Sequence, residues 1–189
     1  MKYQHGKRVM AVLMAAALGA SWTARAEDGA ASPEELAKKF QELSKGRKMS
    51  ALVPLVHPDD RSMLAFGAFM MAGFSAVGAK DQDAAQKELE AIQTKHGVKE
   101  GPKDQPPAQN DAEMTMRMRL MYKDVDVVAY CKALEAYADK YADKSKPEEA
   151  GGPTKIDEIK VNGDEATVTM DGKPGHLTKL NGRWYLRMK

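Results

Sequence analysis

Disulfide, metal and catalytic motifs are scarce in this sequence. It contains one cysteine, Cys131, and four histidines, of which His57, His96 and His176 lie after residue 26. A single cysteine cannot form an intramolecular disulfide, so packing alone has to hold the fold. The three histidines are too far apart for a zinc-ligand spacing, and the G-x-S-x-G, H-E-x-x-H, P-loop and dinucleotide-binding motifs are absent. The sequence therefore predicts no catalytic residue and no cofactor.

A long hydrophobic run is also missing, and the apolar run nearest the N-terminus is short. Lys2, Lys7 and Arg8 precede the run VMAVLMAAALGASW, which is followed by Ala24-Arg25-Ala26. A basic start, a short apolar run and small residues at a cleavage point are typical of a secretory signal peptide. The run is shorter than the roughly 20 residues of a transmembrane helix. We expect residues 1–26 to be a signal peptide cleaved after Ala26, giving a periplasmic or extracellular protein; the alternative is an uncleaved anchor.

The chain from residue 27 onward has no excess of positive charge. The whole sequence contains 29 basic and 27 acidic residues, but residues 1–26 carry four basic residues and no acidic one. The part that remains after cleavage therefore has 25 basic and 27 acidic side chains, a net charge of −2. These charges are interspersed, so the sequence predicts no basic surface for nucleic acid or anionic lipid. No nucleic-acid partner is expected.

Helical patterns occupy the first part of residues 27–189, which we predict to form a single domain. The sequence Ser32-Pro33-Glu34-Glu35 is a capping box, and an apolar stripe follows it at Leu36, Phe40 and Leu43. A short second helix is limited by Pro54, and a solvent-facing helix is expected from Asp81 to His96. A flexible Pro-rich loop covers about residues 98–111. Residues 112–142 are helical again, with an interruption near Lys123-Asp124.

One predicted helix carries almost no charge. Pro58, Asp59 and Asp60 suit a helix start, and residues 62–79 contain no charged side chain. A helix that is apolar on all sides is surrounded either by protein or by lipid. We predict a buried helix over about residues 58–78, with peripheral membrane association as the alternative. No integral membrane span is expected after residue 26, because glycines dilute the hydrophobicity of the segment.

The last part of the chain changes to the two-residue period of strands. Asn162-Gly163 and Asn181-Gly182 are hairpin signals, and residues 144–153 are expected to form a hinge before the strands. A connection over residues 162–165 would pair Val161 with Ala166 and Ile159 with Val168. A connection over residues 181–183 would pair Leu180 with Trp184 and Thr178 with Leu186. The predicted fold class is α+β, with N-terminal helices packed on a C-terminal four-stranded antiparallel meander.

The stretch HPDDR at a predicted helix start and the ending LNGRWYLR carry a family resemblance. They resemble small exported bacterial α+β proteins of the NTF2-like and cystatin-like kind. The resemblance covers HPDDR and roughly the last 35 residues of the chain. It implies either a non-catalytic binding module or an isomerase or dehydratase that uses a pocket carboxylate as general base. No catalytic position of those families is carried over to this chain.

Four methionines lie close together at Met114, Met116, Met118 and Met121. Thioether sulfur favours Cu(I), so an exported protein with this spacing is a candidate for copper binding. However, Arg117 and Arg119 stand between the sulfurs, and residues two apart point about 200° apart on a helix. Methionine also fills irregular gaps in cores. Packing is therefore the preferred interpretation, and a Cu(I) site is the alternative.

The remaining reactive groups are also interpreted as structural. Cys131 shares an apolar stripe with Val127 and Leu134, where a buried thiol is usual. Asp59 and Asp60 are adjacent and so point in different directions on a helix, which suits capping better than acid–base chemistry. We therefore predict an exported, non-catalytic domain that binds a small apolar ligand or a protein partner. The ligand would lie between the sheet and the helix over residues 62–79. An NTF2-like enzyme is the alternative.

Overall fold

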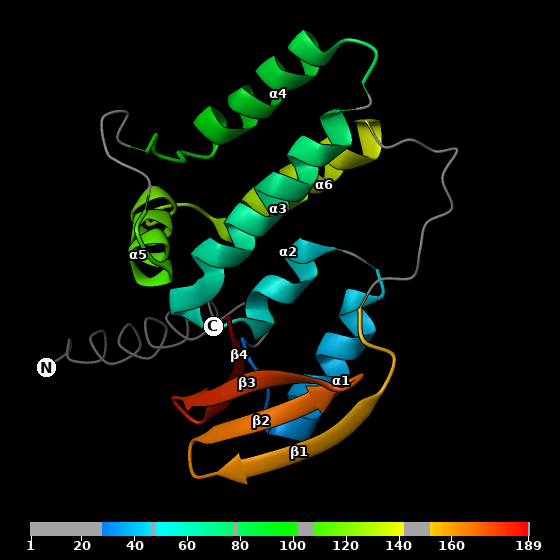
Figure 1. The fold of residues 1–189 in the computed structure, drawn as a ribbon, viewed down its shortest axis with the longest axis vertical. Coiled ribbons are helices and arrows are strands. Elements are labelled where there is room, and N and C mark those ends of the chain that lie inside the picture. Colours follow the sequence, from blue (N-terminus) through cyan, green and yellow to red (C-terminus); the bar gives the residue numbers. More distant parts are fainter. Residues whose placement is uncertain (1–27, 47, 78, 102–107, 142–151, 189) are drawn as a thin grey trace, which may run out of the picture.

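The computed structural model describes residues 28–46, 48–77, 79–101, 108–141 and 152–188. Within these residues, six α-helices precede one four-stranded antiparallel sheet, which confirms the α+β fold class (Figure 1). The predicted signal peptide lies outside the described residues, as do residues 102–107 of the Pro-rich loop and residues 144–151 of the hinge. No helix in the described ranges is both long enough and apolar enough to cross a membrane.

The first elements follow from their capping residues. Helix α1 (Pro33–Ser44) begins after Ser32, whose hydroxyl accepts a hydrogen bond from the Glu35 N–H at 3.2 Å. The Glu35 carboxylate reaches back and accepts the Ala31 N–H at 2.8 Å, one residue before the Ser32 N–H that a standard capping box uses. The predicted cap at Ser32 therefore forms, with its second hydrogen bond shifted by one residue. Leu36 is buried, but Leu43 is exposed at the end of the helix. Three short elements follow: α2 (Met49–Leu52), η1 (Val53–Leu55) and η2 (Pro58–Asp60).

Four further helices form the larger part of the molecule. They are α3 (Arg61–Ala76), α4 (Gln82–Lys95), α5 (Asp111–Met121) and α6 (Val127–Tyr141). Helix α3 lies along α6, and α4 and α5 pack against this pair (Figure 1). The gap between α5 and α6 confirms the interruption expected near Lys123. Tyr130, Cys131, Leu134 and Tyr137 of α6 are fully buried in the core that these helices share.

The sheet is a meander of β1 (Ile156–Asn162), β2 (Glu165–Met170), β3 (Lys173–Leu180) and β4 (Arg183–Arg187). The first hairpin has the predicted register, with Val161 opposite Ala166. The register predicted for the second hairpin was wrong by one residue, because Leu180 pairs with Arg183. The connection there has two residues instead of three. Asn181 and Gly182 both have positive φ, 51° and 80°, as in the tight turns that match the twist of paired strands.

The sheet is covered mainly by α1, whereas α3 packs on α6, so the expected position of α3 against the sheet was wrong (Figure 1). One hydrophobic cluster joins α1 to the sheet, and a second joins α3, α4 and α6. Phe40 and Leu186 pack against both clusters and connect them. The sheet and α3 thus do not form the two facing walls that the expected ligand position requires.

Helix α3 is buried along one face. Leu64, Ala65, Ala68 and Ala72 are buried against the neighbouring helices. The opposite face in the second half of the helix, in contrast, carries Met70, Met71, Phe74 and Val77 in exposed positions. The prediction of a buried helix thus holds for one face, and the expectation that protein surrounds the helix on all sides does not. The cause is that the sheet, which was expected to cover this face, packs on α1.

Candidate functional site

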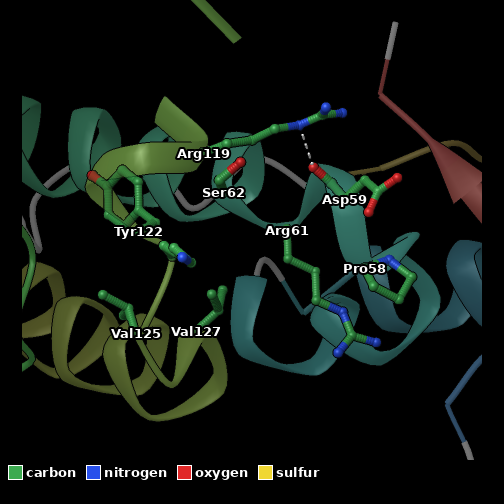
Figure 2. Close-up of a pocket in the computed structure, with 9 residues that line it drawn as sticks. Pro58, Asp59, Arg61, Ser62, Arg119, Tyr122, Val125 and Val127 are labelled. Carbon is green, nitrogen blue, oxygen red and sulfur yellow. Dashed lines mark hydrogen bonds between the residues drawn. The ribbon is translucent and has the colours of Figure 1, made fainter. Parts of the chain in front are cut away.

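A surface depression lies where the start of α3 meets the connection between α5 and α6 (Figure 2). It is open to solvent and has a volume of about 330 Å³. Two segments that are distant in the sequence line it. The first contributes Pro58, Asp59, Arg61 and Ser62, and the second contributes Arg119, Tyr122, Lys123, Val125 and Val127. The site combines polar and cationic side chains with an apolar wall.

Local hydrogen bonds shape both segments. In the first, the Nδ1 atom of His57 accepts the Asp59 N–H at 3.3 Å, and the Asp60 N–H donates to the His57 carbonyl at 2.8 Å. His57 therefore caps the turn η2, and its ring lies edge-on to Tyr185. In the second, the Tyr122 N–H donates to the Met118 carbonyl, which closes α5 beside the depression. Both edges of the depression are thus fixed by short-range contacts.

Beneath the rim, Asp60 is almost fully buried, with its side chain 2% exposed. Its carboxylate accepts hydrogen bonds from Arg187 Nε at 2.7 Å and from the Met188 N–H at 3.0 Å. A longer contact of 3.4 Å joins it to Arg119, whose Nε also donates to the Asp59 carbonyl (Figure 2). Asp60 thereby connects the start of α3 to β4 and α5. A carboxylate whose two oxygens are both held by arginine is not available as a general base.

The other groups in the depression have few partners. Ser62 is 8% exposed, and its hydroxyl makes no hydrogen bond within the described part of the chain. Lys123 is exposed, and its charge acts on the neighbouring Asp124 carboxylate. Arg61 also lines the depression, but its guanidinium is paired with the Asp28 carboxylate at 2.8 Å. The cations that remain at the depression are therefore Arg119 and Lys123.

The sequence carries no signal for this site. The pattern at Asp59 and Asp60 indicates helix capping, and nothing in the sequence assigns Ser62, Arg119 or Lys123 to a binding site. A serine inside a helix and a lysine in a helix connection are ordinary in any sequence. Their separation of about 60 positions carries no spacing signal that a motif could use. The site becomes visible only once α5 is packed against α3.

The four methionines do not share one environment on α5. Met118 is buried at 5% exposure, Met116 is 62% exposed, Met114 is also exposed and Met121 is half-buried. Met116 and Met118 lie on opposite faces, since residues two apart on a helix point about 200° apart. The side chain of Arg117 pairs with Glu113 on the same helix. The burial of Met118 favours packing for this residue, and the Cu(I) site stays a prediction.

Cys131 and the histidines are dispersed through the structure. Cys131 is fully buried, and burial raises the pKa of its thiol to about 12, so the thiolate is not formed at neutral pH. His96 caps the end of α4 beside the ring of Tyr130, and His176 is exposed on β3. Among the described residues, no three histidine, cysteine or acidic side chains come together as a metal site.

Burial also raises the pKa of two tyrosines near the depression. The Tyr122 ring lines the depression, while its hydroxyl points away from Arg61 and Pro58 (Figure 2). Desolvation is the largest cause of the raised pKa of both Tyr122 and Tyr130. Neither phenol ionises at neutral pH, so both act as parts of the core rather than as proton donors or acceptors.

Comparison with protein-family models, with curated proteins and with solved structures found no match to this chain.

Proposed function

We propose that this chain is an exported, non-catalytic domain that binds a protein partner through the exposed apolar face of α3. We call the surface formed by Met70, Met71, Phe74 and Val77 the α3 face. Phe74 is 70% exposed and Val77 is 68% exposed, and both methionines are exposed as well. Contiguous exposed apolar surface of this kind usually marks an interaction site. This exposure is the observation that carries the proposal.

The four side chains belong to one stripe of the helix. Met70, Phe74 and Val77 are separated by four and three positions, and Met71 is three positions before Phe74. Residues at these spacings lie on one side of an α-helix. A methyl group added at Gly67, one turn earlier, would meet no atom within 4 Å. The open surface thus continues along the helix, and no charged side chain of α3 interrupts it after Arg61.

Export and the charge of the chain agree with this role. The signal-peptide pattern of residues 1–26 supports delivery to the periplasm or the extracellular space. The net charge of −2 after cleavage gives no field that would attract nucleic acid. The resemblance of HPDDR and LNGRWYLR to non-catalytic NTF2-like modules also favours a binding role, by analogy alone.

The alternative of an NTF2-like enzyme finds less support. Such an enzyme needs a carboxylate that faces a pocket and is free to accept a proton. Asp60 is the buried carboxylate nearest the depression, and Arg187 and Arg119 occupy its oxygens. Asp59 is exposed to solvent, with 62% of its side chain accessible. The binding role therefore remains the preferred proposal.

Site-specific photocrosslinking tests the proposal. A photoreactive phenylalanine analogue at position 74 should give a discrete crosslinked species in cells that express the full chain. The same analogue at position 161 serves as the control, because Val161 is an exposed apolar residue on β1 of the sheet. No adduct from position 74, or equal adducts from both positions, would contradict the proposed surface. An adduct of twice the chain mass would identify the partner as a second copy.

A second measurement uses an environment-sensitive hydrophobic dye. The double variant Phe74→Ser and Met71→Ser should bind less dye than the wild type while melting at the same temperature. The melting temperature should hold because both side chains are exposed and contribute little to the core. Dye binding that is unchanged in the variant would mean that the α3 face is not an accessible apolar surface.

A further inference from the structure

We infer that strand β1 pairs edge to edge with β1 of a second copy of this chain, so that two sheets join across a two-fold axis. This surface is separate from the α3 face, because β1 belongs to the sheet that packs on α1. Three features carry the inference: an edge strand without a partner, a charge pattern that complements itself in one register, and an exposed apolar side chain beside that edge.

The two edges of the sheet differ in what covers them. Trp184 of β4 exchanges backbone hydrogen bonds with Ala30, and the Leu186 carbonyl accepts the His57 N–H at 2.9 Å. The β4 edge is therefore occupied. Strand β1 forms the opposite edge, and no described strand pairs with its outer side (Figure 1). A copy that extends the sheet must therefore present its own β1, which gives a closed dimer instead of a fibre.

The register of the first hairpin shows which backbone groups face the open edge. Asn162 and Glu165 flank a two-residue turn and form a hydrogen-bonded pair, and such pairs alternate with non-hydrogen-bonded pairs along antiparallel strands. Val161 and Ile159 are therefore in non-hydrogen-bonded pairs with β2, and their N–H and C=O groups point away from it. These groups have no backbone partner among the described residues. An antiparallel second strand would pair with them.

The charges of β1 select one register for this pairing. Glu158 and Lys160 are exposed on the face of the sheet opposite to Ile159, which packs against the α1 cluster. In a two-fold pairing centred on Ile159, Glu158 of each copy lies opposite Lys160 of the other, with Cβ atoms about 4.5–5.5 Å apart. A pairing centred on Lys160 would place two lysines opposite each other, and one centred on Val161 would place Glu158 opposite Asp164. Only the first register joins opposite charges.

The same two side chains also pair with each other within one chain. The Lys160 ammonium lies 2.9 Å from the Glu158 carboxylate, and both side chains are more than half exposed. An exposed ion pair contributes little to stability, so exchanging it for two cross-strand pairs loses little. A lysine on an edge strand usually prevents edge pairing. Here Glu158 lies two positions away on the same face, so the charges restrict the pairing to one register without forbidding it.

Val161 is the third feature. It is 53% exposed, although it lies on the same side of β1 as the half-buried Ile159. In the register centred on Ile159, Val161 becomes the diagonal neighbour of the second copy's Ile159, so the dimer covers apolar surface that one sheet leaves in water. The bulge near Asp157 ends the regular part of the strand, so the paired stretch is short. We therefore expect a weak, reversible dimer.

Analytical ultracentrifugation of the protein that begins at residue 27, from about 10 µM to about 1 mM, measures this dimer. The wild type should shift reversibly from monomer to dimer over this range. Lys160→Glu places like charges opposite each other and should weaken dimerisation at least tenfold. Adding Glu158→Lys to this variant makes the charges complementary again and should restore the affinity to within about threefold of the wild type. Lys132→Glu, the same charge change at an exposed position of α6, is the matched control and should dimerise like the wild type.

The outcomes separate this surface from other contacts. A wild type that stays monomeric over the whole range would overturn the inference, as would equal dimerisation of Lys160→Glu and Lys132→Glu. The double variant Phe74→Ser and Met71→Ser should dimerise like the wild type. Loss of the dimer in that variant would place the contact on the α3 face and would also overturn the pairing of β1.

Hydrogen exchange gives a local measure of the same pairing. The amides of residues 159 and 161 should exchange more slowly in concentrated than in dilute protein, because the second strand accepts their hydrogen bonds. Rates that do not depend on concentration would contradict the pairing. In the crosslinking experiment on the α3 face, this dimer would add a species of twice the chain mass at position 161. Carrying Lys160→Glu in both crosslinking variants removes that species and keeps the two tests separate.

Discussion

The substitution Gly29→Ala should destabilise the protein more than a glycine substitution in a turn usually does. Gly29 has φ of +75°, a conformation that glycine adopts readily and other residues do not. A Cβ atom at this position would lie 2.7 Å from the Trp184 carbonyl oxygen and 2.9 Å from the Cζ atom of Tyr185. The nearest contact is to backbone, so it cannot be relieved by rotating a side chain.

Relief of this contact would require the chain to move away from β4. The Gly29 N–H donates to the Pro54 carbonyl at 2.7 Å. Ala30 and Trp184 exchange two further backbone hydrogen bonds, at 3.0 and 2.8 Å, and Ala30 is completely buried. A net hydrogen bond contributes about 1 kcal/mol, and the left-handed conformation costs an L-residue about 1–2 kcal/mol. Because part of these contacts would survive, we expect a loss of about 2–4 kcal/mol.

Urea unfolding of the chain that begins at residue 27 measures this loss. The sequence contains two tryptophans, Trp22 and Trp184, so Trp184 is the only tryptophan in that chain and its fluorescence reports on the contact itself. Gly163→Ala is the matched control. Gly163 has φ of +63°, but an added Cβ would meet no atom within 4 Å. The control should therefore lose only the conformational part, about 1–2 kcal/mol. Equal losses in the two variants would refute the steric argument.

Three further predictions concern charged and reactive groups. Asp60→Asn should lower the free energy of unfolding by about 2–3 kcal/mol in urea titrations. This lies below the usual range for breaking a buried ion pair, because Arg187 and Arg119 are partly exposed. Cys131 should resist a thiol reagent in the native protein at pH 7 and react fully in urea, because burial raises its pKa to about 12; fast native labelling would contradict this. The backbone N–H of Thr154 lowers the pKa of Asp171 below its ordinary value of 3.8. The ionised Asp171 carboxylate therefore stabilises the fold above pH 3.8, and this stabilisation is lost as the pH falls through the lowered pKa. In acid unfolding, the Asp171→Asn variant should therefore lose less stability between neutral and acidic pH than the wild type loses.

The sequence predicted those parts of the fold that depend on neighbours in the chain. The capping box at Ser32, the interruption between α5 and α6, and the first hairpin each follow from a few adjacent residues. The register predicted for the second hairpin was wrong, because Asn181-Gly182 is compatible with connections of two or three residues. Only the positive φ of both residues shows that the shorter connection is used.

Long-range packing could not be predicted in the same way. The absence of charge in α3 after Arg61 indicates that the helix avoids water, but it does not say which element covers it. The sheet packs on α1, so the face with Met70, Met71, Phe74 and Val77 has no cover among the described residues. A hydrophobic pattern of this kind is the same whether the face is buried in the fold or kept for a partner. The exposed position of Phe74 could therefore be learned only from the structure.

Asp59 and Asp60 show where sequence reasoning about the candidate site ends. They are neighbours with the same side chain, yet one is exposed and the other is almost fully buried. They lie in the 3₁₀ turn η2, where successive residues point about 120° apart, so the two carboxylates must face different surroundings. The sequence predicts this divergence but not its direction. The direction is set by Arg187, which lies 127 positions away and meets Asp60 only when β4 has paired with β3. Because the same ion pair fixes the start of α3, the shape of the depression depends on the closing strand of the fold, although no residue of that strand lines the depression.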